Sequence, residues 1–101
     1  MNSAFQLHTM QDSSELLVGV LKSIANTDRL LTLCHVAKNE LNVSQIEHLT
    51  KINQPTLSQQ LMVLRKNNVV KTRREGKQIF YSVKDHKLVE VVDILHRLYC
   101  S

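Results

Sequence analysis

The stretch NQPTLSQQLMVLRKNN, residues 53–68, combines short polar side chains with leucines at helical spacing. Leu57, Leu61 and Leu64 recur at intervals of four and three residues, which predicts one buried face of a helix. Asn53 or Gln54 can cap this helix, and the proline that follows is tolerated in a first turn because its missing N–H has no partner there. The other face is polar. This division is typical of a solvated surface helix and also of a helix that contacts the edges of DNA bases, so both interpretations stay open here.

Two further helices are predicted at the beginning of the chain. The first runs from about 12 to 25, after the polar sequence DSSE, and the second runs from a cap at Asn26 or Thr27 through about 37. The apolar side chains of the first helix are Leu16, Leu17, Val20, Leu21 and Ile24, and the second carries Leu30, Leu31, Leu33, Cys34 and Ala37.

A short third helix and a hairpin complete the surroundings of the opening stretch. Ser44 and Glu47 fit a capping box at the start of the third helix, in which Ile46 and Leu49 would be buried. After residues 67–68 the helical period ends, and two strands are predicted around a basic turn at Glu75 and Gly76. Asp85 then begins a last helix with residues spaced for burial, namely Leu88, Val89, Val92, Leu95 and Tyr99.

Length and composition limit the possible classes of protein. The 101 residues, 43% of them hydrophobic, predict one domain over 1–101 with a modest core that an oligomer would complete. The apolar run LLVGVL is too short to cross a bilayer, and residues 1–10 do not resemble a signal peptide. We therefore expect a cytoplasmic protein with no membrane partner. A net charge of +4 and a pI of about 9.3 favour a polyanionic partner without naming one.

The order of these elements is that of a winged helix-turn-helix domain, which is mainly α with a small β-hairpin. The opening stretch would then be the recognition helix in the major groove, and the basic hairpin would be a wing on phosphates or the minor groove. The hairpin favours this interpretation, because a merely solvated helix would not need a basic hairpin after it. The residues expected to contact double-stranded operator DNA are Gln54, Thr56, Ser58, Gln59, Gln60, Arg65, Arg73, Arg74 and Lys77.

Three segments resemble those of ArsR-type winged-helix transcriptional repressors. They are ANTDRLLTL, ELNVSQIEHLTKINQPTLSQQLMVLRKNNVV and REGKQIFYSV, and with the flanking helices the likeness covers nearly the whole chain. The resemblance implies a bacterial homodimer built through about 12–25 and 85–100. It also implies a pseudo-palindromic operator that is released when the protein senses a chemical signal.

The metal sites of this family are not matched. Metal-sensing members are similar in a cysteine pair that opens the third helix, where this chain has Asn42 and Ser44. The metal site of the last helix also fails to match around Asp85 and His96. We therefore expect no metal or other cofactor. His96 and Cys100 could still share a helix face and offer two zinc ligands, so a zinc-responsive repressor stays an alternative.

The two cysteines have unremarkable interpretations when taken alone. Without a CxxC motif in a reducing cytosol, a structural disulfide is not expected. Cys34 would be a small buried residue and Cys100 a tail thiol. The chain nevertheless resembles the dithiol subgroup of BigR, SqrR and HlyU, through RLLTLC at 29–34 and LHRLYC at 95–100. That resemblance implies a repressor that senses persulfide or polysulfide by forming a disulfide or polysulfide bridge between Cys34 and Cys100.

Two other functions stay open. The resemblance to HlyU leaves open an activator or antirepressor of virulence genes that senses redox state, and a dedicated protein-binding module is a further alternative. An enzyme is not expected. Cys34 and His35 are adjacent, but consecutive helical side chains point about 100° apart and cannot form a nucleophile and base pair.

Overall fold

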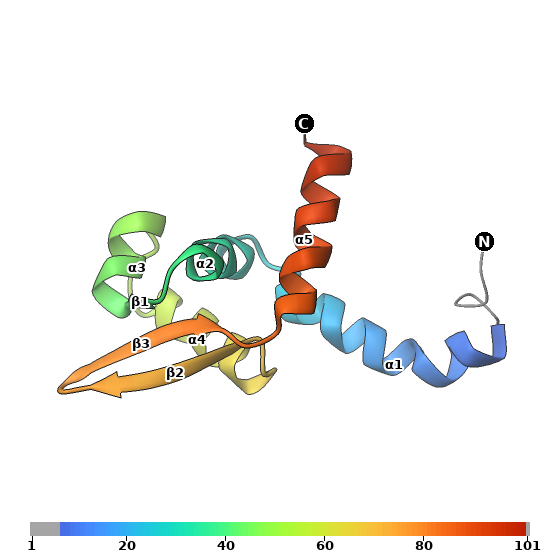
Figure 1. Ribbon diagram of the computed structural model, residues 1–101, viewed down its shortest axis with the longest axis horizontal. Helices are drawn as coiled ribbons and strands as arrows, with labels where there is room; N and C mark the ends of the chain where they lie inside the picture. The colour runs from blue at the N-terminus through green and yellow to red at the C-terminus, as the bar shows by residue number, and fades with distance from the viewer. Residues whose placement is uncertain (1–6, 101) are drawn as a thin grey trace.

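The computed structural model describes residues 7–100, except the side chains of residues 7–10 and 12. The described part of the chain forms, in order, α1 (Leu7–Ile24), α2 (Thr27–Lys38), β1 (Leu41–Asn42), α3 (Val43–Thr50), α4 (Thr56–Lys66), β2 (Val70–Glu75), β3 (Gln78–Val83) and α5 (His86–Tyr99) (Figure 1). This is a winged helix-turn-helix fold, as predicted. The expectation about a signal peptide concerns residues 1–10, of which the first six lie outside the described range.

The helix boundaries follow the predicted caps in two cases. The side chain of Asn26 accepts the backbone N–H of Arg29 at 3.0 Å at the start of α2, and that of Asp85 accepts Leu88 N–H at 3.1 Å at the start of α5. Helix α1, in contrast, begins at Leu7, earlier than the predicted start near residue 12. The reason is that residues 7–11 contain neither glycine nor proline to interrupt the helix.

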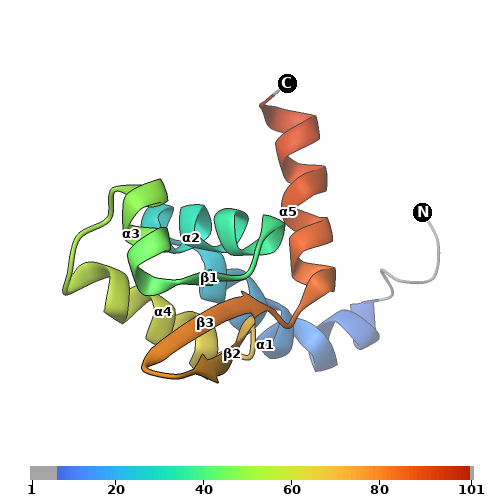
Figure 2. The same cartoon turned by 60° about the vertical axis from the view of Figure 1, so that its left-hand side comes forward.

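The core has two adjoining clusters around α2, which contacts α3, α4, α5 and β3 (Figure 2). Tyr81 of β3 packs against both clusters. One cluster contains Ile24, Leu33, Leu64, Val69, Val70, Val83 and Leu88, and the other contains Val36, Leu41, Ile46, Ile52, Leu57 and Leu61. The prediction that the leucines of residues 57, 61 and 64 anchor α4 is confirmed. Leu49, predicted to be buried, is 47% exposed.

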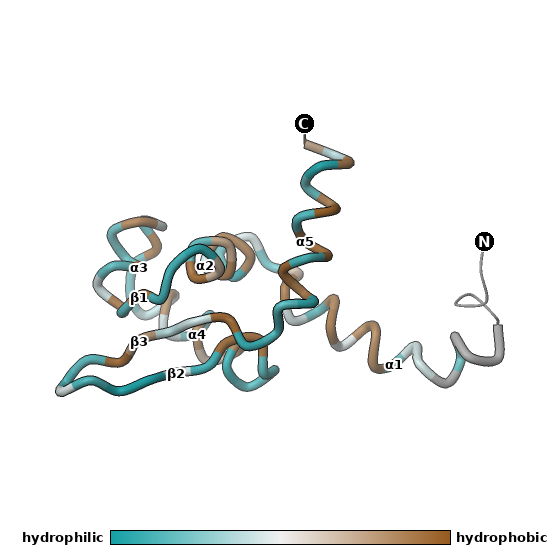
Figure 3. The backbone as a smooth tube through the Cα atoms, viewed as in Figure 1, coloured by the Kyte–Doolittle hydropathy of each residue, from teal (hydrophilic) through white to brown (hydrophobic). Residues whose placement is uncertain are grey.

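Helices α1 and α5 extend away from this core, and apolar residues recur in the described part of each (Figure 3). Many of these residues are exposed, from Leu16 onward in α1 and from Val91 onward in α5. Of the predicted buried face of α1, only Ile24 is buried within the chain. Leu95 and Tyr99 of α5 were also predicted to be buried and are exposed. The helical spacing was correct, but in this single chain nothing in the described part covers these faces.

The sheet has three antiparallel strands in the order β1-β3-β2. Strands β2 and β3 pair from Val70↔Val83 to Glu75↔Gln78, so the turn lies at Gly76 and Lys77, one residue later than predicted. Gly76 has φ of 63°, a left-handed conformation that glycine adopts without steric cost. Strand β1 was not predicted, because two residues are too few to show a period of alternation.

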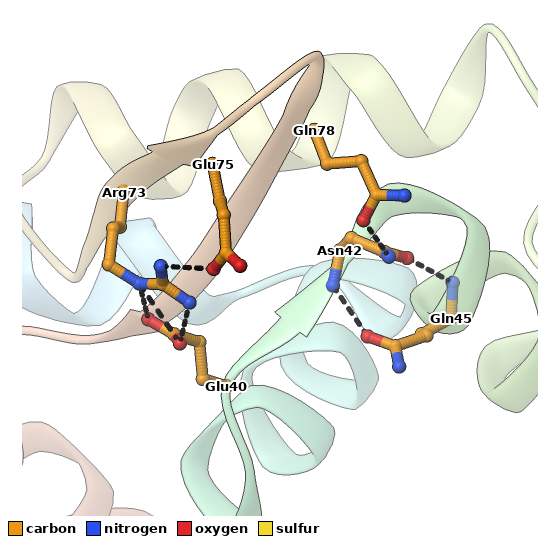
Figure 4. A network of polar contacts seen from close by, with 6 residues as sticks. All are labelled: Glu40, Asn42, Gln45, Arg73, Glu75 and Gln78. Carbon is orange, nitrogen blue, oxygen red and sulfur yellow. Dashed lines mark hydrogen bonds and ion pairs between the residues drawn. The ribbon is translucent and has the colours of Figure 1, made fainter.

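The capping box of α3 uses other residues than those predicted. Gln45 N–H donates to Asn42 Oδ1 and Asn42 N–H donates to Gln45 Oε1, both at 2.9 Å (Figure 4). Asn42 also donates through Nδ2 to Gln78 Oε1 at 2.9 Å. The prediction of Ser44 and Glu47 was wrong. Pairing of β1 with β3 sets Asn42 as the last extended residue, so the helix starts earlier.

Candidate nucleic-acid interface and thiol cavity

The polar face of α4 presents some of the predicted DNA-contacting residues to solvent. Ser58, Gln59 and Arg65 are exposed, and Thr56 is half-buried. Their shared direction follows from the helix itself, because the leucines on the opposite face are held in the core. Ser58 and Arg65 also border an open hollow of about 530 Å³ with Tyr81 of β3. The described geometry therefore brings α4 and the hairpin strand β3 together around one basic, solvent-open surface.

Gln54 has a local structural partner. Its Oε1 accepts the backbone N–H of Ser58 at 3.0 Å and the Ser58 hydroxyl at 2.6 Å. The first N–H groups of a helix have no intrahelical partner, so Gln54 satisfies one of them from a position before the N-cap residue Pro55. Its side-chain carbonyl oxygen is thus occupied, which leaves the amide N–H₂ of this exposed residue as the group available for a further contact.

Gln60 does not share the exposed face of its neighbours. It is half-buried, and its Oε1 accepts a hydrogen bond from Arg29 Nη1 at 2.8 Å. The structure therefore separates Gln60 from Ser58 and Gln59 and places it on the side of α4 that meets α2.

The three basic residues predicted for the wing have different surroundings. Arg73 lies in β2, where its guanidinium group binds Glu40 at 2.7 Å and Glu75 at 2.6 Å (Figure 4). The guanidinium carbon also lies 4.9 Å from the centroid of the Phe80 ring. The hydrogen bond from Arg73 lowers the pKa of the Glu40 carboxyl group, and the two carboxylates raise the pKa of Arg73. Arg73 therefore joins the wing to the segment between α2 and β1.

Arg74 and Lys77 lie closer to the end of the hairpin. Arg74 Nε donates to the carbonyl oxygen of Gly76 at 3.1 Å, and Lys77 is exposed in the turn itself. The alternation of side chains along a strand sends Arg73 and Arg74 to opposite faces of β2. Of the three predicted basic residues, Arg74 and Lys77 are therefore the ones at the end of the wing, and both are exposed.

The cysteines come from helices far apart in the sequence and line one cavity between α2 and α5. The cavity measures about 770 Å³ and is bordered mainly by apolar side chains, with Leu30, Val89 and Val92 among them. Both thiols are free and exposed. The interpretation of Cys34 as a small buried residue was wrong, because its position on α2 borders this cavity.

The ionisable residues that border the cavity include Cys34, Lys38 and His96. Partial burial raises the pKa of the Cys34 thiol, and the positive charge of Lys38 one helical turn later offsets part of that effect. Among the side chains that the structure describes, those of residue 11 and residues 13–100, no group of three or more His, Cys, Asp and Glu is arranged to hold a metal ion, so the pair His96 and Cys100 has no third ligand among them.

Comparison with known proteins gives a consistent family. The model described as "Bacterial regulatory protein, arsR family" matches residues 26–72. The biofilm growth-associated repressor of Agrobacterium fabrum is 43% identical over 81% of this chain and 70% of its own length. The transcriptional activator HlyU of Vibrio cholerae is 37% identical over 94% of this chain and 88% of its own. This chain belongs to the ArsR family.

Solved structures of ArsR-family relatives have the same fold. The transcriptional repressor BigR from Xylella fastidiosa has a TM-score of 0.88 at 35% identity, covering 96% of this chain and 99% of that one. Reduced HlyU from Vibrio cholerae has a TM-score of 0.83 at 37% identity, covering 94% and 100%. The similarity thus includes α1 and α5, which lie outside the segment matched by the family model.

Two residues of this ArsR-family chain matter to the site and were not predicted. Arg29 anchors Gln60, and Glu40 anchors Arg73. An arginine just after the end of one helix is a recognisable signal for capping that helix's carbonyl groups, so part of the role of Arg29 could have been found. Glu40 offers no such signal, because its partner is brought to it only by the sheet.

Among the described residues, no helix has the length and apolar character needed to cross a membrane.

Proposed function

We propose that this ArsR-family chain is a homodimeric transcription regulator of the BigR and HlyU type that releases its operator when Cys34 and Cys100 become joined by sulfur. The observation that carries the proposal is the shared cavity. Two thiols from helices far apart in the sequence border the same apolar hollow, between a core helix and a helix that extends from the core.

Binding of DNA is assigned to α4 and the wing. The short polar side chains of Thr56, Ser58 and Gln59 suit base edges and phosphates in the major groove, and Arg65 suits the adjoining backbone. Arg74 and Lys77 suit phosphates or the minor groove beside it. Gln54 contributes through its amide N–H₂, and Arg73 contributes mainly by holding the wing.

Assembly as a homodimer is supported by the exposed faces of α1 and α5. Side chains such as Leu16, Leu98 and Tyr99 are between 71% and 82% exposed in the single chain. Burying apolar surface contributes roughly 25 cal/mol per Å², so these faces favour association. A two-fold dimer would present two copies of α4 to the half-sites of a palindromic operator, whose centres lie about 34–36 Å apart or a multiple of that.

The sulfur chemistry proceeds in two balanced steps. One cysteine thiolate attacks the outer sulfur of an organic persulfide, RSSH, and forms a cysteine persulfide while RSH leaves. The cysteine persulfide and the second cysteine then form a trisulfide bridge, and the two hydrogens they lose reduce a second RSSH to RSH and H₂S. A direct disulfide requires the two α-carbons to lie within about 7 Å, whereas each inserted sulfur extends the reach by about 2 Å. The bridge would draw α2 and α5 into one arrangement and so bias the spacing of the two α4 helices.

The test uses the reduced full-length protein and its own upstream DNA, with the operator located by footprinting. Organic persulfide or polysulfide should release the operator at doses where peroxide does little, and mass spectrometry should find an intramolecular bridge with added sulfur. Cys34→Ser and Cys100→Ser proteins should bind DNA but no longer respond. Normal release of a Cys100→Ser protein by polysulfide would remove Cys100 from the mechanism.

A regulator that activates transcription is the second candidate, and the similarity to HlyU favours it. The difference between the two lies in the position of the operator relative to the promoter and not in the fold. Transcription from the footprinted promoter, measured with reduced protein present and absent, separates repression from activation. Adding zinc to the same assay tests the zinc-responsive alternative directly.

A further inference from the structure

Arg29 lies where α1, α2 and α4 meet, and its guanidinium group is bonded to two of these helices while its backbone belongs to the third. Nε donates to the carbonyl oxygen of Ser23 at 2.7 Å and Nη2 to that of Lys22 at 3.0 Å, both in the last turn of α1. Nη1 donates to Gln60 Oε1 of α4 at 2.8 Å. The planar fork of arginine can make these bonds together, which the single ammonium group of lysine cannot do.

The α1 side of this contact satisfies groups that the helix leaves open. The last carbonyl oxygens of an α-helix have no intrahelical partner, and a positive charge is favourable at that end. Ser23 is only 4% exposed, so water reaches its surroundings poorly. The backbone of Arg29 is also fixed, since its N–H is bonded to the capping side chain of Asn26. Arg29 therefore holds the α1–α2 corner in one geometry.

On the other side of the contact, the hydrogen bond to Gln60 links the α1–α2 corner to the recognition helix α4. Gln60 is half-buried and lies directly before Leu61, which packs in the core. The leucines fix which face of α4 is buried, and the hydrogen bond of 2.8 Å to a charged group adds a contact that depends closely on distance and angle. The Arg29–Gln60 bond thus restricts the rotation of α4 relative to α1.

We propose that Arg29 is a positioning residue for DNA recognition, acting through Gln60 to couple the orientation of α4 to the end of α1. This role rests on the proposed function, in which α1 forms the dimer and α4 enters the major groove. A change in how two copies of α1 pack would then alter the orientation of α4 through the hydrogen bonds of the Arg29 guanidinium group. Gln60 serves this coupling and is not itself a base contact.

The first test measures the coupling in the free protein. Urea unfolding of wild type, Arg29→Met, Gln60→Met and the double variant should give a coupling of about tenfold in the unfolding equilibrium constant. Arg29→Lys, which keeps the charge, provides a second cycle if Arg29→Met does not fold. Gln59→Met is the matched control, because Gln59 is exposed beside Gln60, and its effect should add to that of either Arg29 variant. An additive result for Gln60→Met overturns the proposal.

The second test measures recognition as the ratio of affinities for operator and for random DNA. Gln60→Met should lower this ratio about fivefold or more while leaving the salt dependence of binding unchanged, since no phosphate contact is lost. Gln60→Glu keeps the oxygen that accepts from Arg29, so it should restore the ratio of affinities. The negative charge that it adds weakens binding to operator and random DNA alike and therefore cancels in the ratio. A wild-type ratio of affinities in the Gln60→Met protein overturns the positioning role of Arg29 but leaves the proposed function standing. A wild-type protein that prefers no DNA sequence overturns the proposed function itself.

Discussion

Cys34 and Cys100 differ in their immediate surroundings although they border the same cavity. Cys34 belongs to the middle of α2, where partial burial raises its pKa and Lys38 partly offsets the effect. Cys100 follows the last turn of α5, and its backbone N–H donates to the carbonyl oxygen of His96 at 2.9 Å. The thiolate is the reactive form of cysteine, so the protonation of Cys34 at neutral pH limits its rate as a nucleophile.

The raised pKa predicts how fast Cys34 reacts at different pH. A raised pKa means less thiolate at any pH below it, so alkylation of a Cys100→Ser protein by iodoacetamide should be half-maximal above the ordinary pKa of cysteine. Lys38→Gln should move that midpoint further upward, because it removes the charge that stabilises the thiolate. The matched control is Glu90→Gln, a change of charge on the exposed surface of α5, which should leave the midpoint unchanged. A midpoint at or below the ordinary value would contradict this account.

Gln54 and Gln59 are predicted to have separable roles, because both are proposed to contact DNA but only Gln54 also stabilises the start of α4. Gln59→Ala should weaken operator preference by roughly 1–3 kcal/mol, the range for a good base contact. Gln54→Ala should in addition lower the free energy of unfolding by about 0.5–2 kcal/mol, because the Ser58 N–H loses its acceptor. Binding to operator and random DNA, together with urea unfolding, distinguishes the two. Equal losses on both DNAs for Gln59→Ala would remove its base contact.

The wing is an element whose orientation depends on a contact outside the hairpin. Arg73 links β2 to Glu40, which lies between α2 and β1, and β1 itself pairs with β3. The pKa of Glu40 is lowered by this hydrogen bond. Its contribution to stability is therefore fully present above the ordinary pKa of glutamate and is lost as the pH falls through the lowered value. At neutral pH the wing is held in place.

The wing residues should differ in their effects on the salt dependence of DNA binding. Arg74→Ala and Lys77→Ala should weaken binding to all sequences alike, and each should reduce the slope by about one unit if it removes a phosphate contact. Glu40→Gln should leave Arg73 with fewer acidic partners and make the slope steeper. Glu47→Gln on α3 is the control for a simple loss of negative charge. Unchanged slopes for Arg74→Ala and Lys77→Ala would separate the wing from DNA.

At the scale of the whole molecule, the apolar faces of α1 and α5 are the largest departure from a self-contained fold. The core around α2 is well buried, with Leu33, Ile46 and Leu57 at 1% exposure or less. In contrast, the two projecting helices leave large apolar side chains in solvent, among them Leu16, Leu21 and Leu98. Apolar residues recur on the traces of both helices (Figure 3). A fold that buries its core so completely yet leaves two helices uncovered is typical of one half of a dimer.

We expect sedimentation to give a dimer at micromolar concentration. Leu21→Glu or Leu98→Glu should shift the protein toward monomers, because a carboxylate would be buried without a partner. Met62→Glu is the matched control: Met62 is 64% exposed and Leu98 is 72% exposed, but Met62 lies on α4. A monomer that still binds a palindromic operator tightly would contradict the dimer.

The sequence by itself determined the order of the helices, the hairpin and the inward face of α4. These features depend on near neighbours, since an apolar period fixes which side of a helix can be buried and a capping side chain bonds to a backbone group three residues away. That is why Leu57, Asn26 and Asp85 were assigned correctly. At the start of α3 the local pattern indicated Ser44 and Glu47, which was wrong, because the pairing of β1 with β3 makes Asn42 the cap.

The tertiary structure alone decided which distant residues meet. Glu40 with Arg73 and Arg29 with Gln60 are pairings between segments separated by whole helices or strands. Cys34 and Cys100 had been paired by the family resemblance and by no local pattern, and the fold brings both to one cavity. Many polar residues of the chain were equally eligible for such contacts. The choice was made by how the helices pack around α2, because core packing admits few arrangements and each fixes what its surface brings together.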